Sequence, residues 1–322
     1  MRPALLLTLL TSAAQADPAL LRLATVIPEG TAWARELLAL SRDAEGAIRI
    51  KWAFGGIAGD EQTMEQRIAR DQLDGTVSGG MLCEKLSPSM RVVRIPGLFQ
   101  SRAEVAHVLS RLKPQIDKEM LAAGFANLAE ASAGASIPLT RMPAHDLAEL
   151  RKQRIWIWDL DEPLKQLLPA MGIPVVPLPL YESARAYDSG RHDGFLTPPQ
   201  AALAFQWSTQ ARWYTDFQFG WIVGCLVVAN RAFDRLPVAT RDALRTAAAK
   251  VQKRMEDVGA HMDEQLLGGL FEKQGLKHLR TTDSARAELF EAARVARDKN
   301  PVVAPELLGK VMSWLADFRA QR

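Results

Sequence analysis

Two closely spaced tryptophans are the first side chains with a possible ligand-binding role. Residues 153–159 read QRIWIWD, so Trp156 and Trp158 alternate with apolar residues and share one face of a short strand. An indole offers a flat apolar wall and one N–H donor, which suits a ligand pocket as well as a protein core. Although core packing is the commoner role for any one aromatic residue, further candidates for ligand contact are Trp33, Phe195, Tyr214 and Phe219.

Motifs for covalent, metal or nucleotide chemistry do not occur in this sequence. The five histidines are scattered, without an H-E-x-x-H pattern or a Cys/His cluster, and no G-x-S-x-G motif is present. The stretch GGIAGDE at 55–61 has neither the G-x-G-x-x-G order nor a Walker lysine. We therefore expect neither an enzyme nor a bound cofactor or metal. Residues 55–61 are interpreted as a tight turn in which Asp60 caps a helix at the mouth of a cleft.

The sequence has two cysteines, Cys83 and Cys225. An exported protein can form a disulfide, but two cysteines so far apart do not make the framework of a small disulfide-rich domain. We favour two buried thiols that pack as small apolar groups over a bridge between them.

The first 16 residues have the pattern of an export signal. MRPALLLTLLTSAAQA contains one arginine, an apolar run too short to span a membrane, and small residues that end in an A-x-A site. Cleavage is expected after Ala16, and the absence of a following lipid-attachment cysteine predicts a free periplasmic or secreted protein. With 40 basic and 37 acidic residues, the charge is too balanced for a nucleic-acid-binding protein.

Strand-like and helix-like runs alternate along most of the chain. The strand-like runs are 21–27, 48–54, 75–80, 154–158, 173–179 and 192–197, and the helix-like runs are 31–45, from 60 onward, 101–124, 144–152, 161–171 and from 199 onward. This alternation predicts an α/β fold with parallel sheets covered by helices on both faces. GWIVGCLVVAN at 220–230 is almost continuously apolar, which predicts a central strand buried on both faces.

The region 240–274 contains no proline and keeps helical periodicity, so a helix of roughly 50 Å is expected at 1.5 Å per residue. Such a helix is longer than one small lobe and would brace two lobes, unless Gly268 and Gly269 break it. The amphipathic stretch at 305–321 predicts a last helix that packs back on the protein.

Five segments, taken in order, are similar to the solute-binding proteins of tripartite (TRAP-type) transporters, the DctP-like family. They read LATVIPEGTAW (23–33), FGGIAGDEQTMEQRIARDQLDG (54–75), RIPGLFQSRAEVAHVL (94–109), MGIPVVPLPLYES (171–183) and ANRAFDRLPVATRDAL (229–244). The resemblance implies a two-lobed periplasmic binding protein with crossing strands, a long connecting helix, and a ligand enclosed by hinge closure. It also implies an integral membrane transporter subunit as partner and no catalysis. We expect one lobe from 17–135 with about 225–262, and the other from 136–224 with about 263–322.

The resemblance further implies an arginine that pairs with a ligand carboxylate, and the present chain departs from that pattern. The position of this arginine falls on Trp156, while Arg154 lies two residues earlier on the same face. A buried carboxylate without a cation would be strongly penalised, whereas an indole wall favours burial of apolar area. The segment that includes Gly79 and Gly80 leaves volume rather than charge. The remaining polar candidates are Asp60, Asp159, Tyr181 and Tyr214.

Three hypotheses follow for the function. The first is a periplasmic binding protein that delivers a bulky hydrophobic or amphipathic ligand, such as a sterol, hopanoid, fatty acyl compound or aromatic, to a membrane transporter. The second is a receptor for a small organic carboxylate in which Arg154 or Arg141 replaces the missing arginine. The third is a ligand-free scaffold or sensor whose cleft is filled by side chains.

Overall fold

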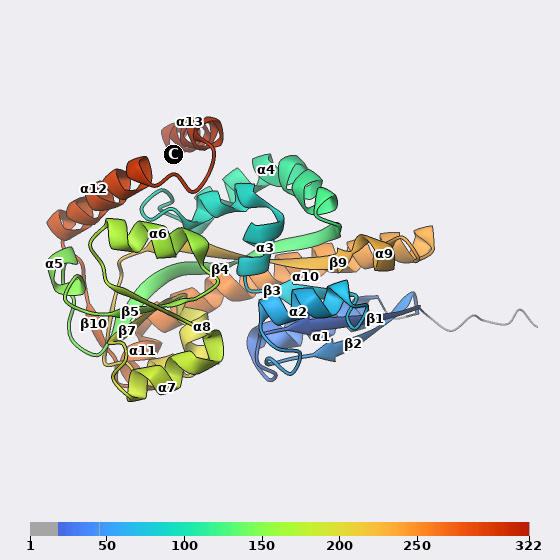
Figure 1. The fold of residues 1–322 in the computed structure, drawn as a ribbon, viewed down its shortest axis with the longest axis horizontal. Coiled ribbons are helices and arrows are strands. Elements are labelled where there is room, and N and C mark those ends of the chain that lie inside the picture. Colours follow the sequence, from blue (N-terminus) through green and yellow to red (C-terminus); the bar gives the residue numbers. More distant parts are fainter. Residues whose placement is uncertain (1–18, 45, 322) are drawn as a thin grey trace, which may run out of the picture.

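The computed structural model describes residues 19–44 and 46–321. The expected export signal and its cleavage after Ala16 lie outside the described residues. The chain forms two α/β lobes, one with the first three strands and α1 and α2, the other with β5, β6 and β7 (Figure 1). No helix in the described ranges is both long and apolar enough to cross a membrane.

The strands form one continuous, mixed sheet in the order β2-β1-β3-β9-β4-β7-β5-β6, with β8 and β10 attached beside β4. Their bounds are β1 (Ala19–Thr25), β2 (Ile48–Ala53), β3 (Gly75–Ser78), β4 (Phe125–Thr140), β5 (Ile155–Trp158), β6 (Val175–Leu178), β7 (Gly194–Thr197), β8 (Trp213–Thr215), β9 (Phe219–Ala229) and β10 (Lys277–Leu279). The expected parallel pairing occurs within each lobe, between β1, β2 and β3 and between β5, β6 and β7. The central strands β4 and β9 are antiparallel to their neighbours.

The helices cover the faces of this sheet (Figure 1). The α-helices of six or more residues are α1 (Ala32–Asp43), α2 (Glu61–Ala69), α3 (Met81–Leu86), α4 (Arg102–Ala122), α6 (Glu162–Ala170), α7 (Ser183–Asp188), α8 (Pro199–Ala204), α10 (Val238–Gln265), α12 (Asp283–Lys299) and α13 (Pro305–Ala320). The other helical segments are η1 (Pro88–Arg94), α5 (Leu147–Leu150), η2 (Leu180–Glu182), η3 (Trp207–Thr209), α9 (Asn230–Phe233), η4 (Leu266–Leu270) and α11 (Phe271–Lys273).

Two strands and one helix run through both lobes. The middle strand β4 pairs with β9 over most of its length and with β7 and β8 at its end. Helix α10 packs along β4 and contacts both α1 and α8. It has 28 residues and spans about 42 Å at 1.5 Å per residue. The continuous α-helix ends before the glycine pair, because Gly269 has a φ of 121°. The expected long connecting helix is therefore present, and it is interrupted at the glycine pair, the break that the sequence allowed for.

Side-chain caps fix where several helices begin near the junction of the lobes. Thr31 accepts a hydrogen bond from the Ala34 amide and Asp60 accepts one from the Thr63 amide. Asp161 caps α6 through the Leu164 amide at 3.1 Å. Because an N-cap side chain satisfies an otherwise orphaned N–H, these polar residues place the helix starts at the carboxyl ends of the preceding strands. The expected cap at Asp60 is present.

Candidate functional site

A cavity of about 120 Å³ lies between the two lobes, beside the crossing strands. Its walls come from the ends of β1 and β3 and from α1 and α10 on one side, and from β5, β7 and α8 on the other. Most of these residues are apolar or small. The polar uncharged residues of its lining are Ser78, Ser132, Thr197 and Gln252. The arrangement can enclose a ligand between the lobes, as expected for a binding cleft.

The two tryptophans of β5 both line this cavity, together with Trp33 of α1. Trp158 reaches toward the first lobe, since a Cβ built on Gly79 would lie 3.8 Å from its Cζ3 atom. The Nε1 of Trp158 is buried and has no hydrogen-bond partner among the described residues. The N–H of Trp158 is therefore available to a polar atom that enters the site.

Trp156 is a fixed part of the wall. Its exposed fraction is 3%, and its Nε1 donates to the Leu178 carbonyl at 3.1 Å. Behind it, Trp207 lies 4.9 Å away between ring centroids, and Trp207 stacks on both Phe195 and Phe205. Such aromatic contacts add to the stability that apolar burial supplies. The indole therefore has a defined orientation.

One buried ion pair supplies all the charge in the cavity wall. Arg94 and Asp161 are the charged residues among the lining residues that the structure describes, and both are almost fully buried. Nη2 of Arg94 donates to Oδ2 of Asp161, and Nη1 donates to the Trp221 carbonyl at 3.1 Å. Nε lies 3.4 Å from Oε1 of Glu84. The guanidinium is therefore already surrounded by two carboxyl groups before any ligand arrives.

The second carboxyl group beside Arg94, that of Glu84, has a raised pKa. Burial raises the pKa of Glu84 well above its usual value of 4.5, and the nearby Asp161 and Glu61 raise it further against the effect of Arg94 and Arg91. Burial would lower the pKa of Arg94, but Asp161 and Glu84 keep it above its ordinary value. The guanidinium and the two carboxyl groups therefore form one compact, buried cluster in which each group affects the others.

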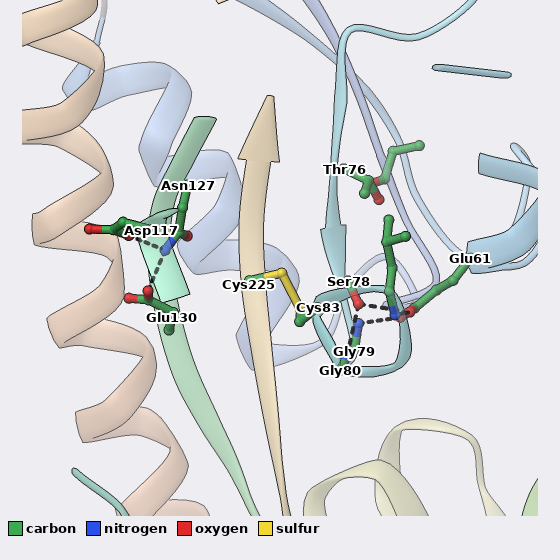
Figure 2. Close-up of a disulfide and its surroundings, with 12 residues drawn as sticks. Glu61, Thr76, Ser78, Gly79, Gly80, Cys83, Asp117, Asn127, Glu130 and Cys225 are labelled. Carbon is green, nitrogen blue, oxygen red and sulfur yellow. Dashed lines mark hydrogen bonds between the residues drawn. A yellow bond between two sulfur atoms is a disulfide. The ribbon is translucent and has the colours of Figure 1, made fainter. Parts of the chain in front are cut away.

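Another buried carboxyl group shapes the turn that borders the cavity. Glu61, the first residue of α2, accepts hydrogen bonds from Ser78 Oγ at 2.7 Å, from Leu82 N at 2.7 Å and from Gly79 N. Figure 2 shows its carboxylate turned toward Ser78 and Gly79. Burial raises the pKa of Glu61 despite these donors. Gly80 has a φ of 129°, and a Cβ there would lie 3.3 Å from the Val223 carbonyl.

Cys83 and Cys225 form a disulfide, so the expectation of two free thiols was wrong. β9 pairs with β3 through Ser78 and Cys225, and this register brings Cys225 next to the start of α3. The Cα atoms of the two cysteines are 5.9 Å apart, within the normal range for a bridge. Cys225 also lines the cavity, and Figure 2 shows the bridge between β9 and α3.

Asp60, Asp159 and Tyr181 lie at the junction of the lobes but outside the cavity lining. Burial raises the pKa of Asp159, and the charge of Asp60 adds to this effect. Burial likewise raises the pKa of Tyr181 to about 12, with further contributions from Asp60 and Glu61. The hydroxyl of Tyr181 approaches the loop after β2, where a Cβ on Gly56 would lie only 2.2 Å from it. These residues therefore form a contact between the lobes.

Four further expected ligand contacts, besides Asp60, Asp159 and Tyr181, also lie outside the cavity lining. Phe195 is buried behind Trp207 and Trp156. Tyr214 stacks on His278 in a separate core, and Phe219 packs in the core under α6 and α12. Gly80 adjoins the lining residue Gly79 but faces β9.

The two arginines considered as substitutes are engaged elsewhere. Arg154 is half exposed and pairs with Asp193 at 2.9 Å, and it also donates to the Gly190 carbonyl at 2.7 Å. Arg141 donates to the Tyr187 carbonyl, and its guanidinium lies 4.0 Å from the centre of the Tyr187 ring. Neither arginine lines the cavity.

Sequence reasoning missed the pair of Arg94 and Asp161. Arg94 stands in the apolar run RVVRIPGLF, and an arginine inside such a run signals a buried charge that needs a partner. The run itself contributes η1 and the turn after it. Its partner, Asp161, comes directly before the helix-like stretch EPLKQLL. At that position the sequence indicates only a helix cap. Nothing local in the sequence connects the two.

The sequence matches the model of one protein family, DctP, described as bacterial extracellular solute-binding protein, family 7, over residues 25–300. No curated protein is significantly similar to this chain. Many solved structures share its fold.

Three of these structures illustrate the likeness. A TRAP periplasmic solute-binding protein from Roseobacter denitrificans with bound L-galactonate is 18% identical, with a TM-score of 0.82 over 92% of this chain and 98% of that one. One from Xanthobacter autotrophicus with bound β-D-galacturonate is 21% identical, with a TM-score of 0.83 over 92% and 99%. DctP7 of Bordetella pertussis, an extracytoplasmic solute receptor binding pyroglutamic acid, is 16% identical, with a TM-score of 0.84 over 92% and 99%.

These structures confirm the predicted two-lobed α/β fold with a long connecting helix. The family match covers most of the chain and confirms the resemblance seen in the sequence. The protein is thus a non-enzymatic solute-binding protein, and it belongs to the DctP family, family 7 of the bacterial extracellular solute-binding proteins.

Proposed function

We propose that this protein is the periplasmic receptor of a TRAP transporter and that it carries a hydrophobic or amphipathic ligand to the integral membrane subunit. One observation supports a hydrophobic or amphipathic ligand over a charged one. The charged residues of the cavity wall, Arg94 and Asp161, pair with each other, while Trp156 occupies the position where the resemblance implies a carboxylate-binding arginine. An apolar ligand body gains free energy of about 25 cal/mol per Å² of surface buried against such a wall.

A second candidate is a receptor for a small organic carboxylate, and the comparisons favour it. The three related structures hold L-galactonate, β-D-galacturonate and pyroglutamic acid, all of which carry a carboxyl group. In this chain the cation would have to come from Arg94, because Arg154 and Arg141 lie outside the cavity lining. The ligand would then compete with Asp161 for the same guanidinium.

The hypothesis of a ligand-free scaffold has less support. It expected a cleft filled by side chains, whereas a cavity of about 120 Å³ lies between the lobes. A protein that only signals by shape would gain nothing from keeping this space open, since an unfilled cavity costs stability.

The test is to identify what the protein carries. The chain from Asp17 onward is produced in a bacterial host and denatured in organic solvent, and the released molecules are identified by mass spectrometry. Candidates are then titrated by tryptophan fluorescence. We expect a near-stoichiometric apolar or amphipathic molecule. A small carboxylate that binds tightly and saturably would overturn the proposal in favour of the second candidate.

A charge placed in the wall separates the two candidates further. Trp156→Arg should abolish binding of the apolar ligand, because it adds an unpaired buried cation to the site. Trp52→Arg is the matched control, since Trp52 is a half-buried tryptophan of β2 outside the cavity. If Trp156→Arg folds and leaves the ligand profile unchanged, the cavity is not the binding site.

A further inference from the structure

We propose that the ligand is a small, uncharged molecule of one ring or one short branched chain, with a neutral hydrogen-bond acceptor that meets the Arg94–Asp161 pair. This inference rests on the proposed function and narrows it. It concerns the net charge of the ligand, the kind of polar atom it carries and its size.

The net charge of the ligand is inferred from the groups already present around Arg94. Asp161 occupies one side of the guanidinium, and its other oxygen is held by the Leu164 amide as the cap of α6. Glu84 faces Nε. A ligand carboxylate would bring a further acid to this one buried cation, and like charges at such a site disfavour one another. A neutral ligand adds no charge to the cluster of Arg94, Asp161 and Glu84.

The hydrogen-bond acceptor on the ligand is inferred from N–H groups of the cavity wall that have no partner. A guanidinium has five N–H groups, and the hydrogen bonds of Arg94 to the Trp221 carbonyl and to Asp161 use one on each Nη. Its Nε lies 3.4 Å from Glu84 without a hydrogen bond between them. One N–H on each Nη therefore remains for a ligand atom. Trp158 adds a buried Nε1 donor without a partner among the described residues. Buried donors are costly when unsatisfied, so an amide, ketone or hydroxyl oxygen is favoured over a purely hydrocarbon ligand.

The size of the ligand is inferred from the volume of the cavity and from residues of its wall that are held in place. The cavity holds about 120 Å³, close to the roughly 150 Å³ of an engineered protein cavity that takes up benzene. Trp156 is held by its hydrogen bond to Leu178 and by its packing on Trp207, and Cys225 is held by its disulfide to Cys83. A molecule of one ring fits this space better than a polycyclic sterol or hopanoid does when the lobes are together.

The test uses matched pairs that differ in charge but hardly in shape. Benzamide and benzoate, phenylacetamide and phenylacetate, and isobutyramide and isobutyrate are titrated into the mature protein at pH 7.5 by calorimetry, after ligand is stripped in urea with the disulfide intact. We expect at least one amide to bind at least 10-fold more tightly than its acid, and cholesterol presented in cyclodextrin not to bind.

The other outcomes separate the claims. An acid that binds as tightly as its amide overturns the charge assignment and favours the carboxylate receptor. Binding of cholesterol overturns the size assignment but leaves the proposed hydrophobic receptor standing. If no amide, acid or sterol binds, this inference is overturned, and the proposed function is decided separately by the molecule that mass spectrometry identifies.

A double variant tests the role of the ion pair. Asp161→Asn with Glu84→Gln leaves Arg94 without an anionic neighbour in the cavity, while asparagine retains a capping oxygen for α6. We expect the acids to gain at least 10-fold in affinity relative to the amides. Asp193→Asn with Glu182→Gln is the control, because it removes the same charge near the surface. An unchanged preference in a folded double variant overturns the assignment, and the wild-type titrations decide it if the variant does not fold.

Discussion

Cys83 of α3 is bonded to Cys225 of β9, and the second of these residues forms part of the cavity wall. The bridge joins residues 142 positions apart in the sequence. It fixes the helix that follows the turn at Gly79 and Gly80 against the strand that crosses between the lobes. Stability and ligand binding should therefore both depend on the oxidation state of this pair.

Replacement of both cysteines by serine should lower the free energy of unfolding by about 3–5 kcal/mol, because a long loop is no longer closed in the unfolded chain. Urea unfolding followed by circular dichroism measures the difference. Wild-type protein kept reduced with dithiothreitol should behave like the variant.

The single variants supply the control for this prediction. Cys83→Ser and Cys225→Ser should each lose about as much stability as the double variant, since either change removes the same bond. Stability that stays the same in dithiothreitol, together with two thiols that react with iodoacetamide in the unreduced protein, would show that the bridge does not form.

Much of the fold could be predicted from the sequence because its local signals agree with its tertiary structure. The longest strand that was not predicted is β4, whose sequence FANLAEASAGASIPLT is rich in alanine, serine and glycine and has low strand propensity. It becomes a 16-residue strand because β9, β7 and β8 pair with it. Tertiary pairing outweighs intrinsic preference in such a strand.

The candidate site could be predicted only where a single residue carried the signal. Trp33, Trp156 and Trp158 stood out by type and position, and all three line the cavity. The contacts of Arg94 with Asp161 and of Cys83 with Cys225 join distant segments. Such pairs depend on strand order, which one sequence does not reveal. Phe195, Tyr214 and Phe219 looked like site residues but lie in the protein core.

The contact between Gly56 and Tyr181 should control closure of the lobes. A Cβ at Gly56 would overlap the tyrosine hydroxyl, so Gly56→Ala should weaken ligand binding by about 1 kcal/mol through overpacking of the closed form. Gly55→Ala is the matched control, because Gly55 also has a positive φ but its nearest neighbour would be the Pro28 Cα at 3.7 Å. Both variants carry the same backbone strain of about 1–2 kcal/mol.

Calorimetric titration and small-angle X-ray scattering with ligand check this prediction. Equal affinities for the two variants, with equally compact bound forms, would show that Tyr181 moves aside without effect on closure.

Stability should fall as the pH rises above about 5 because of Glu84. Burial raises the pKa of Glu84 in the folded protein above the usual 4.5. At pH values between 4.5 and this raised pKa, the folded state binds more protons than the unfolded state. Unfolding therefore becomes easier as the pH rises. Glu84→Gln imitates the protonated acid and removes this contribution. The variant should therefore gain in melting temperature relative to wild type as the pH increases.

Thermal unfolding at several pH values measures this difference. Glu65→Gln is a control, because Glu65 lies nearer the surface and pairs with Lys85. If Glu84→Gln is less stable than wild type by the same amount at every pH, Glu84 is ionised and contributes an ion pair to Arg94.

Arg154→Ala should change the affinity for any ligand by less than about twofold. The guanidinium is half exposed and pairs with Asp193 outside the cavity, and exposed substitutions usually change free energies by within about 0.5 kcal/mol. Fluorescence titration of the variant against wild type measures the effect. Loss of carboxylate binding in this variant would mean that Arg154 turns into the cleft and supplies the cation in place of Arg94.

The path of the chain through the crossing strands has a consequence for the order of folding. The sheet of the first lobe places β3 beside β9, so Gly75 pairs with Val228, and α1 packs on the still later α10. The first lobe thus stays incomplete until β5, β6 and β7 of the second lobe have been made. Contacts between such distant segments slow folding, since long loops must close first. Fragments that end before β9 therefore lack strands of both lobes, and we expect the protein to fold as one cooperative unit rather than lobe by lobe.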